Sequence, residues 1–145
     1  MRIFIDADGC PVVDIAVRTA KKYGVKCTII CDTAHSIQRD GADTIIVDKG
    51  ADSADFRLVN LVSTGDIAIT QDYGLAAMCL SRRAVVLDQN GRQYTEENIP
   101  GLLEFRAVSA KIRRSGGRTK GQHKRIAQQD IDFERALAEL LEHTE

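Results

Sequence analysis

Short apolar segments alternate with helical patterns along residues 1–88 of the chain. Each segment is rich in isoleucine and valine, as expected of strands that helices cover on both faces. Strands separated by helices in this way are typical of βαβ units around a parallel sheet. The pattern therefore predicts an α/β fold with a mostly parallel sheet, whose strands cover residues 3–5, 27–31, 44–47, 67–70 and 84–87.

The helices that connect these strands carry recognisable signals at their ends. Pro11 can start the first helix, and Gly24 is placed to end it. The second helix is expected over residues 53–62, and the third over residues 74–80. Each helix would return the chain from the end of one strand to the start of the next.

After residue 88 the regular alternation stops. The length of 145 residues suits a single domain, so we expect residues 1–88 to form an α/β core and residues 89–145 to form a helical extension of it. The extension should contain a turn, a helix start, a helix, a glycine-rich basic loop and a final amphipathic helix, over residues 88–91, 95–97, 102–114, 115–121 and 130–141.

Composition and charge add two points to this picture. With 43% hydrophobic and 28% charged residues, the chain is globular rather than disordered, collagenous or a disulfide scaffold. The formal net charge of −1 hides an uneven distribution. Residues 105–129 contain eight basic residues and no acidic one, whereas residues 130–145 contain six acidic residues and one basic one.

The N-terminal sequence and the cysteines indicate a cytoplasmic protein. Neither a signal-peptide pattern nor an apolar stretch long enough to span a membrane is present. In a reducing compartment the four cysteines are expected to be structural thiols. A zinc site formed by Cys27, Cys31 and His35 fails on geometry, because residues four apart on a strand lie about 13 Å from each other.

Candidate chemistry gathers where the predicted strands end. Asp6 and Asp8 directly follow the first strand, and Asp72 directly follows the fourth. Ligands of open parallel sheets bind outside the carboxyl ends of the strands, so these carboxylates converge if the two strands are neighbours. Asp52 and Asp55, at the start of the second helix, share one helical face and can point to the same place. Because clustered carboxylates repel one another, the pattern predicts a site for Mg²⁺ or Mn²⁺.

Each carboxylate also has an ordinary structural interpretation. Asp8, followed by glycine, can form a turn, and Asp52 can cap the second helix. Asp55 can be a solvated surface charge, whereas Asp6 and Asp72 are harder to explain structurally. Asp66 precedes the fourth strand, which places it at the opposite edge of the sheet in a structural role.

Four strings of the sequence carry a family resemblance, namely Phe4-Ile5-Asp6-Ala7-Asp8-Gly9-Cys10-Pro11, Gly50-Ala51-Asp52-Ser53-Ala54-Asp55, Gly65-Asp66-Ile67-Ala68-Ile69-Thr70-Gln71-Asp72 and Gly91-Arg92-Gln93-Tyr94-Thr95. Together they resemble the YaiI/YqxD family of bacterial proteins, and the resemblance extends over nearly the whole chain. This largely uncharacterised family is similar to a branch of the PIN-like nuclease superfamily.

The resemblance implies a PIN-like, Rossmann-like three-layer α/β/α sandwich with C-terminal helices. It also implies an acidic metal site that hydrolyses phosphodiester bonds, usually in RNA. Asp6, Asp55 and Asp72 match the superfamily carboxylates, with Thr70 in a supporting place beside Asp72. Asp8 belongs to the family strings rather than to the superfamily core, as does Asp52.

The chain departs from the family pattern at three places. Gly9 stands where alanine is usual, Tyr73-Gly74 replaces a more apolar pair, and Lys120-Gly121-Gln122 lacks the proline that commonly follows the glycine. None of these differences removes a carboxylate.

These observations lead to a hypothesis about the reaction. Asp6, Asp55 and Asp72, with Asp8 and Asp52 as further ligands, would hold Mg²⁺ or Mn²⁺ and activate a water for in-line attack on a phosphodiester. The expected function is that of a metal-dependent endoribonuclease-type hydrolase with RNA as its partner. A homodimer is an open alternative for the assembly.

The basic segment is the candidate nucleic-acid contact. Its side chains would hold backbone phosphates with a steep dependence on salt and little dependence on base sequence. In the competing interpretation, the acidic terminal helix folds back and neutralises this segment. The residues concerned are Lys111, Arg113, Arg114, Arg118, Lys120, Lys124 and Arg125.

Two other functions stay open at this stage. Haloacid-dehalogenase-like phosphatases also place Asp-x-Asp-Gly after a first strand, which would make Asp6 a nucleophile and Asp8 a general acid–base. Gly65-Asp66 and Asp72 would then form the metal motif. That class needs its Gly-Asp pair after a strand, whereas Asp66 precedes one. The other alternative is a non-catalytic module that binds metal or RNA, because a fold by itself does not establish an activity.

Overall fold

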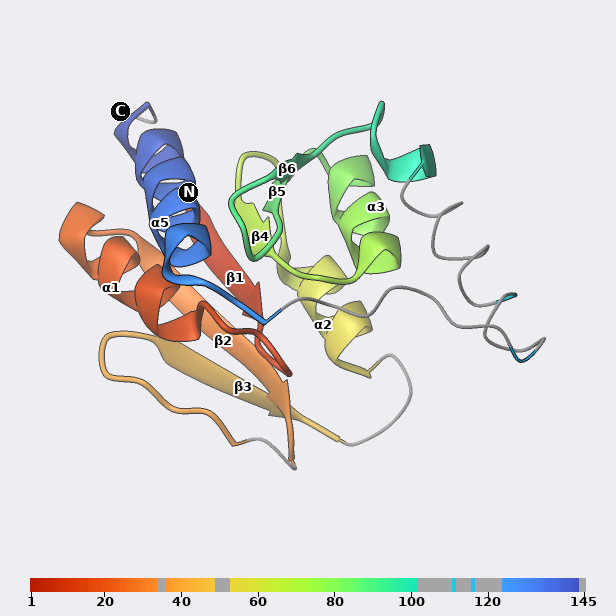
Figure 1. Cartoon of the computed structure of the whole chain (residues 1–145). Helices are drawn as coiled ribbons and strands as arrows, with labels where there is room; N and C mark the ends of the chain where they lie inside the picture. Colours follow the sequence, from red (N-terminus) through yellow and green to blue (C-terminus); the bar gives the residue numbers. More distant parts are fainter. Residues whose placement is uncertain (34–35, 49–52, 102–110, 112–115, 117–123, 144–145) are drawn as a thin grey trace.

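A six-stranded sheet with strand order β3-β2-β1-β4-β5-β6 forms the centre of the computed structural model (Figure 1). The structure describes residues 1–33, 36–48, 53–101, 111, 116 and 124–143. The elements are β1 (Arg2–Asp6), α1 (Val13–Tyr23), β2 (Lys26–Asp32), β3 (Asp43–Val47), α2 (Ser53–Leu61), β4 (Ile67–Ile69), α3 (Tyr73–Ser81), β5 (Val85–Leu87), β6 (Gln93–Tyr94) and α5 (Ala127–Glu142).

The first five strands pair in parallel, and β6 pairs antiparallel with β5. The order reverses at β1, which has β2 on one side and β4 on the other. Strands β1 and β4 are therefore neighbours, as the expected convergence of carboxylates requires. Their register pairs Ile5 with Ile69, so the residues that follow, Asp6 and Thr70, lie at the same level of the sheet.

Helices cover both faces of the sheet and complete a three-layer α/β/α sandwich. Ile3 and Ile5 pack in one core cluster with α1 and α5, whereas Phe4 packs in a second cluster with α2 and α3. This alternation is the two-residue period of a strand. It places Asp6 on the face covered by α2 and α3, because the side chain of Asp6 follows Phe4 by two positions.

The elements agree with the sequence predictions to within a few residues. Gly24 ends α1 with a left-handed φ of 67°, as expected of a glycine that closes a helix. Pro11 lies two positions before the first residue of α1 rather than in it. The last helix begins at Ala127, three residues before the predicted start.

Other parts of the extension were predicted less completely. The strand β6 was not predicted. The turn chemistry after β5 is confirmed, since Asp88 Oδ1 accepts from the backbone amides of Asn90 and Arg92 over 2.8 and 2.9 Å. The helix start is confirmed by hydrogen bonds from the Asn98 amide to Thr95 Oγ1 and from the Thr95 amide to Asn98 Oδ1. The predicted helix 102–114 and basic loop 115–121 lie outside the described residues, apart from positions 111 and 116.

Candidate functional site

Thr70 links the carboxyl ends of the two central strands. Its hydroxyl donates a hydrogen bond to Asp6 Oδ2 over 2.8 Å and accepts one from the backbone amide of Asp72 over 3.0 Å. Thr70 is only 1% exposed. A buried hydroxyl that both donates and accepts is fixed in direction, so it holds the Asp6 carboxylate against the loop that carries Asp72. The structure thus brings together two of the predicted site residues and the predicted supporting threonine.

Asp72 is also the N-cap of α3. Its backbone is extended, and Oδ1 accepts a hydrogen bond from the Leu75 amide over 3.1 Å. A carboxylate in this position is favoured by the positive end of the helix dipole. One carboxylate oxygen of Asp72, a predicted metal ligand, therefore caps a helix. Helix capping was expected only of Asp52.

Asp8 lies in a turn, as in its alternative interpretation, and the Cys10 amide donates to the Ala7 carbonyl across that turn over 3.0 Å. The side chain of Asp8 makes a separate, long-range contact. Its two carboxylate oxygens lie 3.1 and 3.3 Å from the backbone amide of Asp32, which donates to them. Gly9 follows with a positive φ of 72°. The Gln71 side chain donates to the Gly9 carbonyl over 2.9 Å, so the loops after β1 and β4 are joined directly.

Asp32 is an acidic residue at this edge that the sequence analysis missed. It ends β2, the strand on the other side of β1. Because Ile30 packs in the cluster of α2 and α3, the two-residue period places Asp32 on the same face of the sheet as Asp6. The rule that selected Asp6 and Asp72, an aspartate directly after an apolar strand, would also have selected Asp32.

The second helix supplies the remaining predicted ligands. Asp52 lies outside the described residues, and the backbone of Asp55 is in the first turn of α2, but its side chain is not described. Within the described part of the chain, no group of three histidine, cysteine or acidic side chains is arranged to hold a metal ion. The described donors are carboxylate and hydroxyl oxygens, which suit Mg²⁺ or Mn²⁺. A complete metal site would therefore need Asp55 or Asp52 as well.

Cys10, between this edge and α1, has a thiol whose pKa is raised, so it is protonated at neutral pH. The pKa of its thiol is raised from 9.0 to about 11; burial is the largest cause, and the negative charge of Asp6 also acts to raise it. The backbone amide of Val12 and the positive charge of Arg125 act in the opposite direction. Cys27, Cys31 and Cys79 are buried free thiols, in agreement with the structural role expected of them.

The basic segment is described only in part. Lys111 and Lys124 are exposed. Arg125 contacts Asp130 through Nε over 2.7 Å, Asn90 Oδ1 through Nη1 over 2.9 Å, and the carbonyl of Gln89 through Nη2 over 2.7 Å. It thus ties the start of α5 to the turn after β5, and this one residue of the basic segment is paired with an acidic residue of α5. The other predicted contacts lie outside the described residues, namely Arg113, Arg114, Arg118 and Lys120.

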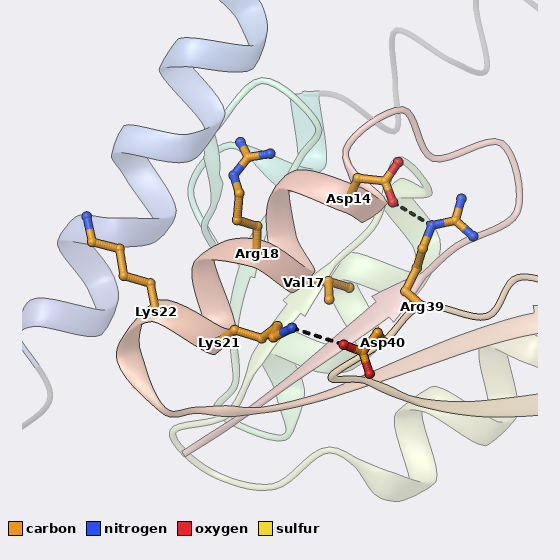
Figure 2. A pocket seen from close by; sticks show the side chains of 7 residues that line it. All are labelled: Asp14, Val17, Arg18, Lys21, Lys22, Arg39 and Asp40. Atoms are coloured by element: carbon orange, nitrogen blue, oxygen red, sulfur yellow. Dashed lines mark hydrogen bonds and ion pairs between the residues drawn. The ribbon is translucent and has the colours of Figure 1, made fainter.

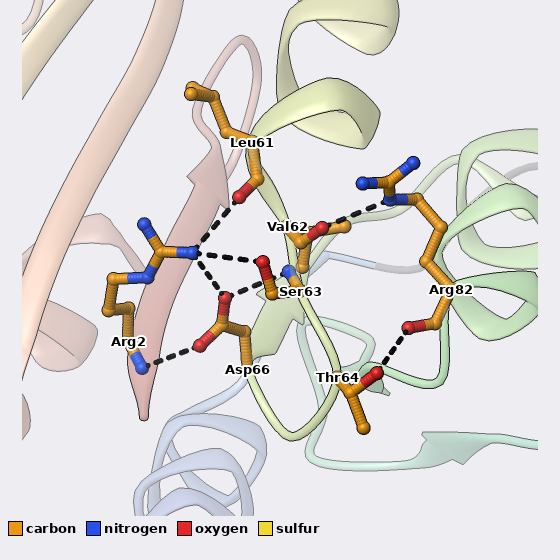
Figure 3. Close-up of polar contacts among 7 residues, drawn as sticks. All are labelled: Arg2, Leu61, Val62, Ser63, Thr64, Asp66 and Arg82. Carbon is orange, nitrogen blue, oxygen red and sulfur yellow. Dashed lines mark hydrogen bonds and ion pairs between the residues drawn. The ribbon is translucent and has the colours of Figure 1, made fainter.

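Asp66 directly precedes β4, so it lies at the opposite edge of the sheet, as expected. Figure 3 shows its contacts. It is 4% exposed, and its Oδ2 accepts from Arg2 Nη2 and from the Ser63 amide, both over 2.9 Å. Its Oδ1 accepts from the Arg2 amide over 3.0 Å. Asp66 therefore cannot belong to a metal motif with Asp72, which removes a premise of the phosphatase alternative.

A hollow of about 480 Å³ lies between α1 and the loop before β3 (Figure 2). Four basic side chains line it, but two ion pairs cross it, between Arg39 and Asp14 and between Lys21 and Asp40. These pairs fasten the loop to the helix. The hollow is thus explained by the fold.

No helix in the described part of the chain is long and apolar enough to cross a membrane.

Comparison with known proteins gives one consistent result. The family described as "Uncharacterized BCR, YaiI/YqxD family" matches residues 4–143. A UPF0178 protein of Exiguobacterium sibiricum is 52% identical over 141 residues, which cover 97% of this chain and 96% of the relative. A UPF0178 protein of Ruminiclostridium cellulolyticum is 51% identical over 94% of this chain and 90% of its own length. No solved structure matches the chain significantly. The chain therefore belongs to the uncharacterised YaiI/YqxD family of bacterial proteins.

Proposed function

We propose that this protein is a metal-dependent hydrolase of phosphodiester bonds, with RNA as its substrate. The observation that carries the proposal is the hydrogen-bonded unit of Asp6, Thr70 and Asp72. It joins the ends of two strands that are 64 residues apart in sequence, at the reversal of strand order where open α/β sheets bind ligands.

The residues divide the chemistry among themselves. Asp6 and Asp72 would hold the cation together with Asp55, and Asp8 and Asp52 would lie around them. A bound divalent cation supplies a water of lowered pKa and neutralises charge at the phosphate. Thr70 fixes the orientation of the Asp6 carboxylate before the cation binds, so cation binding loses less side-chain entropy.

The basic segment supports a polymeric substrate. Seven lysines and arginines within residues 111–125 would hold phosphates on either side of the cleaved bond. Arg125 is already engaged with Asp130, so we expect its contribution to be smaller than that of Lys111 or Lys124. Charge reversal of Arg113 and Arg114 should reduce both RNA affinity and its dependence on salt.

A cleavage assay tests the proposal. Labelled single-stranded RNA, duplex RNA and DNA would be incubated with the wild-type protein and Mn²⁺, Mg²⁺ or a chelator. We expect cleavage of RNA that needs the metal, and a loss of at least 100-fold in Asp6→Asn. The matched control is Asp43→Asn, an exposed aspartate at the start of β3 whose partner is Lys26. Equal cleavage by wild type and Asp6→Asn, or none by either, would contradict the proposal.

The non-catalytic alternative rests on a specific observation. Asp8 and Asp72 each accept backbone hydrogen bonds, which is a sufficient structural reason for their presence. If Mn²⁺ and RNA bind but no nucleic acid is cleaved, this alternative replaces the proposed hydrolase.

A further inference from the structure

Tyr94 is a buried titratable residue that the proposed chemistry does not use. It belongs to β6 in the extension of the domain and is 4% exposed. Its hydroxyl donates a hydrogen bond to the backbone carbonyl of Thr70 over 3.3 Å. The antiparallel register pairs Tyr94 with Val86 of β5, the strand beside β4. A residue from the extension thus contacts the threonine at the centre of the candidate site.

The ring of Tyr94 makes a second contact with the same loop. It packs edge-to-face on the ring of Tyr73, with ring centroids 5.9 Å apart and an interplanar angle of 64°. Tyr73 is the first residue of α3 and directly follows Asp72. Tyr94 therefore contacts both ends of the segment 70–73 and leaves Asp72 between two fixed points.

The hydroxyl of Tyr94 stays protonated at neutral pH. Burial raises the pKa of Tyr94 well above its usual value, and the nearby groups of Asp88, Tyr73 and Asp72 raise it further. A phenol that does not ionise is a permanent donor to the Thr70 carbonyl. That carbonyl is buried and belongs to the residue whose hydroxyl holds Asp6, so loss of the donor would remove a hydrogen bond from the centre of this segment.

We propose that Tyr94 is a positioning residue of the site. It holds the segment 70–73 so that Thr70 presents its hydroxyl to Asp6 and its hydroxyl oxygen to the Asp72 amide. The expected consequence of this positioning is tighter metal binding, and in that respect the inference rests on the proposed function. It also gives the extension a role that the basic segment does not account for, because β6 couples the extension to the acidic edge.

The test compares two variants that each lose one phenolic oxygen. Tyr94→Phe removes the donor to Thr70. Tyr23→Phe is the matched control, because the Tyr23 hydroxyl donates to Glu142 Oε1 over 2.6 Å, at the end of α1 and away from the carboxyl edge. Mn²⁺ affinity would be measured by calorimetry on metal-free protein. Hydrogen exchange of the Asp72 amide, which donates to Thr70 Oγ1, would be measured in the same metal-free samples.

We expect Tyr94→Phe to bind Mn²⁺ about tenfold more weakly, at the lower end of the range for groups that orient metal ligands. Its Asp72 amide should exchange about tenfold faster, because the Thr70 hydroxyl that accepts from this amide is then less firmly held. Tyr23→Phe should match the wild type in both measurements. Unchanged exchange of the Asp72 amide in Tyr94→Phe would overturn the inference. If the wild type binds Mn²⁺, an unchanged Mn²⁺ affinity in Tyr94→Phe would also overturn it.

The two proposals fail in different ways. A wild-type protein that binds no Mn²⁺ contradicts the proposed function, and then the exchange at Asp72 alone decides whether Tyr94 holds the segment. A wild type that binds Mn²⁺ and a Tyr94→Phe variant of equal affinity contradict only the positioning role.

Discussion

The two edges of the sheet use aspartate for different purposes. At the amino edge, Asp66 is buried, paired with Arg2 and hydrogen-bonded to two backbone amides. At the carboxyl edge, Asp6 is held by the hydroxyl of Thr70, and Asp8 by the amide of Asp32. The first edge satisfies its carboxylate with a cationic side chain of the fold itself. At the second edge, the described contacts of these two carboxylates include a side-chain hydroxyl and a backbone amide.

This difference has an energetic meaning. A carboxylate with a guanidinium partner and amide donors stabilises the folded state. Neighbouring carboxylates repel one another, and that repulsion is relieved when a cation binds. The contacts of Asp66 indicate a role in stability, whereas the carboxyl edge is where we propose a cation to bind. The following substitutions test the comparison.

The largest effect on stability is expected at the amino edge. Asp66→Ala removes the acceptor of three hydrogen bonds. The backbone amides of Arg2 and Ser63 then lose the carboxylate to which they donate. The free energy of unfolding should fall by about 3 kcal/mol. Urea denaturation measures it. A loss below about 1 kcal/mol would mean that the two edges do not differ in the way described.

A smaller effect on stability is expected at Thr70, which is buried and belongs to the proposed site. Thr70→Val keeps the shape of the side chain but removes the hydroxyl that serves Asp6 and Asp72. We expect a loss of about 1–2 kcal/mol in the free energy of unfolding, together with weaker Mn²⁺ binding. Thr70→Ser, which retains the hydroxyl, should bind Mn²⁺ nearly as the wild type does. Equal Mn²⁺ affinity in Val and Ser variants would contradict this role.

Asp72 allows capping to be separated from metal binding. Asp72→Ala removes the cap of α3 and should cost about 1 kcal/mol of stability, whereas Asp72→Asn keeps an acceptor for the Leu75 amide. Both variants should bind Mn²⁺ more weakly, because both lose the charge. Thermal unfolding and calorimetry distinguish the two effects. If Asp72→Asn binds Mn²⁺ like the wild type, the residue is only a cap.

The smallest effect concerns pH at the amino half of β2. The pKa of Cys27 is raised from 9.0 to about 12, mainly by burial and to a lesser extent by the charge of Asp43. The unfolded thiol therefore ionises first, so this contribution to stability is present below pH 9.0 and is lost as pH rises toward about 12. At about pH 9.5 the loss for one thiol is under about 1 kcal/mol. In Cys27→Ala, unfolding measured between neutral pH and about pH 9.5 should show a shallower decline.

Much of the fold could be predicted from local patterns. Five strands and the helices between them follow from apolar periodicity, proline and glycine, and Asp66 was placed at the correct edge by its position before a strand. Strand β6 was missed because two residues, Gln93 and Tyr94, are too few to show a period.

The candidate site was predictable in its residue types but not in its contacts. An aspartate after a strand identifies Asp6 and Asp72, and the same rule would have found Asp32. The hydrogen bond from Thr70 to Asp6 joins residues 64 positions apart, so no local sequence pattern predicts it. The same reason applies to Arg125, whose basic side chain suggested phosphate binding but contacts Asn90, which lies 35 positions away.

The central claim is that the carboxyl edge is a metal site, and a Mn²⁺ titration tests it most directly. Calorimetry would be run on wild type, Asp6→Asn and the control Asp43→Asn, each first freed of metal with a chelator. We predict saturable Mn²⁺ binding to wild type and Asp43→Asn, and an affinity at least tenfold lower in Asp6→Asn with no loss of folding. Identical isotherms for wild type and Asp6→Asn, or no binding to either, would contradict the claim.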